Sequence, residues 1–63
     1  MNVGANIHRI REEKGIAQAR LAEQAQVSQS MLCQIERGTK LPSLPLGAEL
    51  ARLLGCELQE LLQ

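Results

Sequence analysis

Phenylalanine, tyrosine and tryptophan are absent from this chain of 63 residues. The interior must therefore be built from aliphatic side chains and methionine, packed as helices on helices. Proteins that bind single-stranded nucleic acid or RNA loops usually stack bases on aromatic rings, so this absence argues against a binder of that kind. A chain this short is expected to form one domain, residues 1–63, whose core is too small to enclose a substrate pocket as well.

Cysteine and histidine are also scarce. The two cysteines, Cys33 and Cys56, do not make a disulfide framework and lack the spacing of a metal clip, so we expect reduced thiols. The single histidine, His8, is expected to be a solvated residue of the first helix, because no serine, cysteine or carboxylate pair is spaced around it as a catalytic base requires. We therefore expect no catalytic residue, no metal, no cofactor and no enzyme activity.

The sequence also lacks a long apolar run and an excess of charge of either sign. No segment is long enough to span a membrane and the amino terminus has no signal-peptide core, which predicts a cytoplasmic protein. The net charge is zero, but residues 1–40 carry six Lys and Arg against four Glu, whereas residues 41–63 carry one Arg against three Glu. The basic excess therefore lies in the first two thirds of the chain.

The segment from Gln18 to Gly38 carries the most informative pattern that is present. Apolar residues recur there at three- and four-residue steps, in two runs that each predict a short amphipathic helix. Ser28 can accept a hydrogen bond from the free N–H groups that open the second helix, and Val27 can fill the angle between the two helices. This layout predicts a helix-turn-helix, with apolar stripes formed by Leu21, Ala22 and Ala25 and by Leu32 and Ile35.

The outer face of the second helix is polar. At about 100° per residue, Gln29, Ser30, Cys33, Gln34 and Arg37 fall on the side opposite the apolar stripe. A glutamine amide offers one acceptor and two donors in a plane, which matches the N6 and N7 edge of adenine, and a serine hydroxyl can serve either partner. Any solvated helix also has a polar outer face, so this pattern is compatible with a plain surface helix too.

The remaining segments also predict helices. The first helix buries Ile7, Ile10 and Val3 after a short lead-in, Met1 to Gly4, and ends at Gly15. Ser43 is suited to cap a helix that tolerates Pro45 in its first turn and is closed by Gly55. The apolar stripe of that helix consists of Leu46, Leu50, Ala51 and Leu54, and a short leucine-rich segment, Glu57 to Gln63, follows it.

Several ordered and spaced sequence blocks run along almost the whole chain, although each alone is weak. They are Ala5 to Gly15 (ANIHRIREEKG), Gln18 with Leu21-Ala22, Val27 to Ser30 (VSQS), Ile35 to Gly38 (IERG), and Pro42-Ser43 leading to Leu50-Ala51 and Leu54 to Cys56. Through these blocks the chain resembles the Cro and phage-repressor (XRE-type, lambda repressor-like) helix-turn-helix domains over almost its whole length. This resemblance implies an all-α, compact five-helix bundle whose second and third helices form the helix-turn-helix, and a regulator, expected to be a repressor, that binds double-stranded DNA sequence-specifically.

The resemblance also implies roles for individual residues. Gln18 is expected to clamp a DNA phosphate, and Gln29, Ser30 and Gln34 are expected to reach base edges in the major groove. The loop after the recognition helix is expected to follow the DNA backbone through Arg37, Thr39 and Lys40. Without the surrounding blocks, Gln18 would be an ordinary helix-start residue and the loop a plain exposed one.

Three further expectations concern the framework of the domain. The family pairs an arginine of the first helix with the glutamate of the Glu-Arg-Gly step, so Arg11 and Glu36 are expected to form an ion pair, since either charge would be costly to bury alone. The family commonly has glycine where this chain has Gln26, so a positive φ there would be strained. It commonly has Ser or Thr where this chain has Ala17, so a helix cap is missing.

The leucines near the end of the chain predict self-association. Leu58, Leu61 and Leu62 lie close to the chain's end and are expected to form the surface of a homodimer, although packing back onto the core would account for one or two of them. With few surplus cations, one subunit should bind DNA weakly, so we expect two subunits on a palindromic operator. Two other interpretations stay open: an antitoxin-type module that binds a protein partner on the same fold, or the DNA-binding part of a longer regulator.

Overall fold

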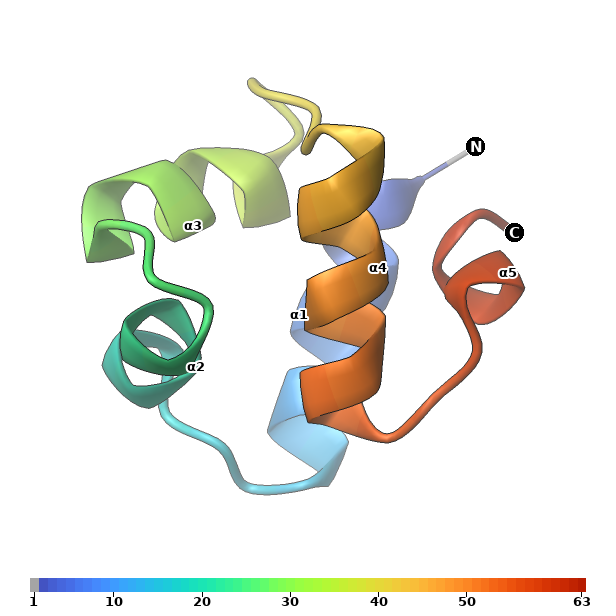
Figure 1. The fold of residues 1–63 in the computed structure, drawn as a ribbon, viewed down its shortest axis with the longest axis horizontal. Helices are drawn as coiled ribbons and strands as arrows, with labels where there is room; N and C mark the ends of the chain where they lie inside the picture. The colour runs from blue at the N-terminus through green and yellow to red at the C-terminus, as the bar shows by residue number, and fades with distance from the viewer. Residues whose placement is uncertain (1) are drawn as a thin grey trace.

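The computed structural model describes residues 2–63, which form five helices and no strand. The helices are α1 (Val3–Glu13), α2 (Gln18–Gln24), α3 (Gln29–Arg37), α4 (Leu44–Leu54) and α5 (Leu58–Leu61). In Figure 1, α1 and α4 stand side by side at the centre, with α2 and α3 on one side of them and α5 on the other. The expected all-α five-helix architecture is therefore confirmed, with the helix-turn-helix formed by α2 and α3. No helix among the described residues is long and apolar enough to cross a membrane.

All five helices contribute to one aliphatic core. The largest side chains in it are completely or almost completely shielded from solvent, and each contributes about 1.5–3 kcal/mol of burial free energy. Ala22 is also buried, and its small side chain lets α2 lie close to its neighbours. The largest buried side chains are Ile7, Leu21, Leu32, Ile35, Leu50, Leu54 and Leu61.

The helix ends are defined by local side-chain and backbone chemistry. The Ser28 hydroxyl accepts a hydrogen bond from the Met31 amide at 3.0 Å, and the Ser43 hydroxyl accepts one from the Leu46 amide at 3.3 Å. Gly38 and Gly55 follow α3 and α4 in the left-handed conformation, with φ of 86° and 71°. The predicted start of α3 at Ser28 and the predicted close of α4 at Gly55 are confirmed.

The expected lead-in from Met1 to Gly4 is wrong for residues 3 and 4, while Met1 lies outside the described residues. Helix α1 already includes Val3 and Gly4, and both are buried. A Cβ atom at Gly4 would overlap the carbonyl oxygen of Ile35 in α3, so the two helices cross closely at this point. How closely two helices cross depends on the residues of both helices. The sequence around Gly4 alone therefore does not reveal this contact.

The proposed dimer surface needs a correction at Leu61. This side chain is fully buried within its own domain, whereas Leu58 is partly buried and Leu62 is 42% exposed. The Asn6 side-chain amide donates to the carbonyl oxygens of Leu61 at 3.0 Å and Gln63 at 2.8 Å, and so ties the end of the chain to α1. Leu61 is therefore a core residue and does not belong to an exposed surface.

Candidate nucleic-acid interface

The exposed side of α3 carries the polar residues that the sequence places there. Gln29, Ser30, Gln34 and Arg37 are all exposed, and Cys33 is half-buried among them. On the opposite side of the same helix Leu32 and Ile35 are completely or almost completely buried. The amide-bearing side of α3 is therefore not covered by the protein's own residues, and a groove of duplex DNA could approach it.

The turn between α2 and α3 is tight. Val27 donates its amide hydrogen to the carbonyl oxygen of Ala22 at 3.0 Å, which closes the carboxyl end of α2. Gln26, just before it, adopts a φ of 61°, the only positive φ of a non-glycine residue among residues 2–63. Ala17, before α2, has extended backbone and makes no side-chain cap. The positive φ anticipated at Gln26 and the missing cap anticipated at Ala17 are therefore both present.

Arg11 and Glu36 form a buried ion pair between α1 and α3. The Arg11 Nε donates to Glu36 Oε2 at 2.8 Å, and the Arg11 Nη2 donates to Glu36 Oε1 at 3.1 Å. Only 8% and 4% of the two side chains are exposed. The Arg11 Nη1 also donates to the carbonyl oxygen of Ile16 at 2.7 Å. A bidentate pair of this kind fixes α3 relative to α1 and to the loop before α2.

The pKa of Glu36 reflects two opposing effects. Burial raises the pKa of this carboxyl group, but hydrogen bonds from Arg11, His8 and Gln18, together with the charge of Arg11, lower it further than burial raises it. The net result is a pKa of Glu36 below its ordinary value of 4.5. The pKa of Arg11 is raised, chiefly by its hydrogen bond to Glu36. Glu36 is therefore ionised at neutral pH.

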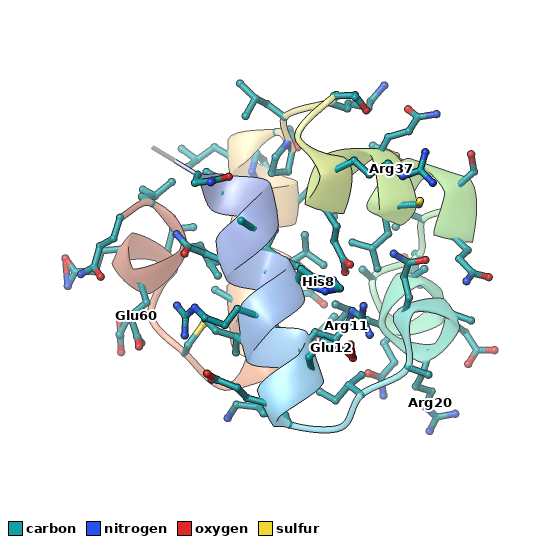
Figure 2. The ribbon with its side chains drawn as sticks, turned by 180° about the vertical axis from the view of Figure 1, so that it is seen from behind. His8, Arg11, Glu12, Arg20, Arg37 and Glu60 are labelled. Atoms are coloured by element: carbon teal, nitrogen blue, oxygen red, sulfur yellow. The ribbon has the colours of Figure 1, made fainter. Side chains whose placement is uncertain are left out.

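His8 is exposed on α1, as the sequence predicts, but its ring also contacts the ion pair. Its Nδ1 lies 2.9 Å from Glu36 Oε1 and 3.2 Å from Arg11 Nη2. In Figure 2 the His8 ring points from α1 toward the space between α1 and α3, beside Arg11. Sequence reasoning missed this contact because His8 and Glu36 are 28 residues apart, and only the crossing of α1 and α3 brings them together.

A chain of hydrogen bonds runs from this ion pair to the exposed side of α3. The Gln18 Nε2 donates to Glu36 Oε1 at 3.2 Å, and the Gln29 Nε2 donates to Gln18 Oε1 at 3.3 Å. Gln18, at the start of α2, is thus oriented by a buried carboxylate and in turn orients the first side chain of α3. A shallow hollow opens at this junction, lined by His8, Gln18, Cys33, Glu36 and Arg37.

Comparison with known proteins identifies the family. The family model described as helix-turn-helix matches residues 7–61. The chain belongs to this helix-turn-helix family.

Individual relatives of this helix-turn-helix protein agree with that assignment. The chain is 39% identical over 59 residues to an uncharacterised HTH-type transcriptional regulator, y4dJ, of Sinorhizobium fredii (strain NBRC 101917 / NGR234), covering 94% of this chain and 77% of that protein. It is 42% identical over 57 residues to the immunity repressor protein of Bacillus phage phi105, covering 90% of this chain and 40% of the repressor. The chain thus spans less than half the length of that phage repressor.

Two solved structures share the fold. The crystal structure of the clp gene regulator ClgR from Corynebacterium glutamicum superposes with a TM-score of 0.93 at 34% identity, over 97% of this chain and 65% of ClgR. The master regulator for biofilm formation SinR, crystallised in complex with DNA, superposes with a TM-score of 0.89 at 34% identity, over 97% of this chain and 98% of SinR. The five-helix arrangement of this helix-turn-helix protein is therefore shared along nearly its full length.

The loop after α3 of this helix-turn-helix protein holds the remaining predicted residues. Thr39 and Lys40 are both exposed. The Thr39 amide and hydroxyl both donate to the carbonyl oxygen of Gln34, at 3.0 and 3.1 Å, so this residue also closes the carboxyl end of α3. Within residues 2–63 neither Arg37 nor Lys40 forms an ion pair, in contrast to Arg9, Arg20 and Arg52, whose partners are Glu13, Glu23 and Glu49.

Proposed function

We propose that this chain is a transcriptional regulator, acting as a repressor, that binds double-stranded DNA sequence-specifically and inserts α3 into the major groove. The observation that carries this proposal is the exposed amide and hydroxyl side of α3, held in place by the buried pair of Arg11 and Glu36. The helix-turn-helix family membership and the likeness to SinR, a protein solved with DNA, support it. Such a regulator would act in the cytoplasm, where it meets the chromosome.

The proposal assigns two kinds of contact. Gln29, Ser30 and Gln34 would read base edges, since their donors and acceptors project from one side of a helix that fits the major groove. The residues around this side would contact the DNA backbone, which positions the protein without reading sequence. These backbone contacts are assigned to Gln18, Arg37, Thr39 and Lys40.

We infer that the regulator acts as a homodimer on a palindromic operator. Residues 1–40 hold a surplus of only two cations over anions, which leaves one subunit few phosphate contacts. Leu41, Leu44 and Leu62 are 76%, 70% and 42% exposed, and they line an apolar hollow that Leu58 also borders. A second copy of the chain would cover these leucines and place two recognition helices on adjacent turns of the DNA.

Selection of bound sequences from random duplex DNA tests the DNA-binding proposal. The purified chain should enrich a palindrome whose half-sites are centred about one helical turn apart, roughly 34 Å. A chain that retains no duplex above the level of unselected DNA would refute the proposed function.

Sedimentation equilibrium tests the dimer. Leu44→Glu and Leu62→Glu should each shift the chain toward the monomer, because a buried charge opposes association. Gln24→Glu, an exposed change on α2, is the matched control and should leave the mass unchanged. A wild-type chain that stays monomeric at high concentration and on its operator would exclude the homodimer.

A further inference from the structure

The hollow beside α3 contains a titratable group that has no part in the assignments above. His8 lines this hollow together with Gln18 and Arg37, and 52% of its side chain is exposed. Gln18 and Arg37 are both assigned to DNA phosphates, so an anion bound by them would lie close to the imidazole ring.

The orientation of the His8 ring is set by Glu36. The Oε1 atom of this carboxylate lies 2.9 Å from His8 Nδ1, and this is the shorter of the two contacts that Nδ1 makes. A neutral ring can favour this contact only as the Nδ1–H tautomer, because a lone pair on Nδ1 would face the lone pairs of the carboxylate. The Arg11 Nη2, 3.2 Å from Nδ1, lies 3.1 Å from the same Oε1 and donates to that charged oxygen.

This orientation decides what the second ring nitrogen can do. With Nδ1–H bound to Glu36, the Nε2 of a neutral ring carries a lone pair and repels an anion. A protonated ring keeps the bond to Glu36 and gains an N–H donor on Nε2, together with a positive charge. Protonation therefore converts the outward edge of His8 from an acceptor to a cationic donor, without any movement of the ring.

The charges around His8 decide whether its protonation makes the hollow attract an anion. Arg11, on the same helix, is paired with Glu36 of α3 and also lies 3.8 Å from the carboxylate of Glu12 on α1, which does not line the hollow. Helix α2 contributes only the neutral Gln18 to the hollow. Arg37 of α3 adds a positive charge, and Cys33 of α3 adds a neutral thiol. Glu36 and Arg37 carry opposite charges, so a proton on His8 changes the net charge of the side chains that line the hollow from zero to +1. A hollow of this charge attracts an anion such as a phosphate.

We propose that His8 binds a DNA backbone phosphate through its Nε2 only when the ring is protonated, so that DNA affinity rises on acidification. This inference rests on the proposed function, because it places the hollow against duplex DNA. It adds a contact that is absent at high pH and present at low pH.

The test measures Kd for one duplex, selected as described above, between about pH 5.5 and 8 at constant ionic strength. Wild-type affinity should rise on acidification by up to about tenfold per pH unit, the limit for uptake of one proton. The slope of log affinity against log salt should also be steeper by about 0.9 at the acid end, as expected for one extra phosphate contact.

Three variants separate His8 from other titrating groups. H8Q should lose both the pH dependence and the change in salt slope, whereas H8K should bind tightly with no pH dependence across the range. R9Q changes an exposed neighbour that lies outside the hollow and should behave as the wild type does. Thermal melts of each variant at each pH show that the folded chain is being titrated.

The outcomes are distinct. If H8Q keeps the wild-type pH profile and salt slope, or if wild-type affinity does not change with pH, the assignment of His8 to a phosphate is overturned while the proposed function stands. If the wild-type chain binds no duplex at any pH, the proposed function itself fails, and the inference about His8 fails with it.

Discussion

Gly4 in α1 lies directly against the carbonyl oxygen of Ile35 in α3, with no space between them for a Cβ atom. A side chain at this position must push α3 away from α1, or the helices must tilt. Gly4→Ala is therefore expected to destabilise the fold by about 1–3 kcal/mol or more, as overpacking does. Urea unfolding followed by far-UV circular dichroism measures the loss.

The matched control for this change is Gly47→Ala in α4. The nearest atom to a Cβ there is Leu58 Cδ1 at 3.6 Å, an ordinary van der Waals contact. Alanine in place of a helical glycine should stabilise by up to about 1 kcal/mol. A Gly4→Ala variant as stable as the Gly47→Ala variant would mean that α1 and α3 do not cross as closely as described.

Gln26 adopts a left-handed backbone conformation, with φ of 61°, at the turn between α2 and α3. This conformation costs a residue with a Cβ atom about 1–2 kcal/mol. Gln26→Gly should therefore raise Tm, by about 4–8 °C for each kcal/mol gained, with no change in the preferred DNA site. Gln24→Gly, at the last residue of α2, should lower Tm instead. Equal effects at both positions would contradict the strain at Gln26.

Ala17 and Ser28 precede the two helices of the motif with nearly the same backbone geometry. Their φ and ψ are −68° and 142° for Ala17 and −71° and 152° for Ser28, but only Ser28 caps its helix with a side chain. Ala17→Ser should therefore stabilise by about 0.5–2 kcal/mol, and Ser28→Ala should destabilise by a similar amount. Differential scanning calorimetry of the two variants measures both effects. No gain from Ala17→Ser would show that its hydroxyl does not reach the first turn of α2.

The ion pair predicts how stability depends on pH. Because the folded-state pKa of Glu36 lies below its ordinary value of 4.5, its stabilisation is complete above that value and is lost as the pH falls through the lower folded-state pKa. Glu36→Gln should cost about 1.5–3 kcal/mol at neutral pH, through the loss of charged hydrogen bonds. The difference between wild type and variant should shrink in acid below pH 4.5, as chemical unfolding at each pH would reveal.

Glu13→Gln is the control for the pH experiment. Glu13 is exposed and lies 3.5 Å from Arg9 in a solvated pair, so its replacement should change stability by less than about 1 kcal/mol. If the cost of Glu36→Gln were the same in acid as at neutral pH, the ionised carboxylate would not be the stabilising species.

Gln34 and Lys40 are expected to affect DNA binding in different ways. Gln34→Ala should cost about 1–3 kcal/mol and relax the preference at one position of each half-site, because the amide is assigned to a base edge. Lys40→Ala should weaken binding to all sequences alike and reduce the salt slope by about 0.9, because the ammonium is assigned to a phosphate. Competition between the selected operator and single-base variants distinguishes the two patterns. An unchanged preference in Gln34→Ala would remove Gln34 from the base-reading set.

The sequence alone determined the helix boundaries of the motif and the side of α3 that faces outward. Caps such as Ser28 and Ser43 act on amides three residues away, and the αL glycines close helices through bonds of similar range. The polar face of α3 follows from helical periodicity, which is also local. The pairing of Arg11 with Glu36 could be anticipated only through the family resemblance, because nothing local links two residues 25 positions apart.

Only the tertiary structure decided the contacts that depend on how helices pack against one another. It placed Gly4 against Ile35, turned His8 toward Glu36, and buried Leu61 where self-association was expected. Asn6 reaches the carbonyl oxygen of Leu61 across 55 residues of sequence. Such contacts arise from distances and angles between helices, which the whole core sets at once, so no short window of residues contains them.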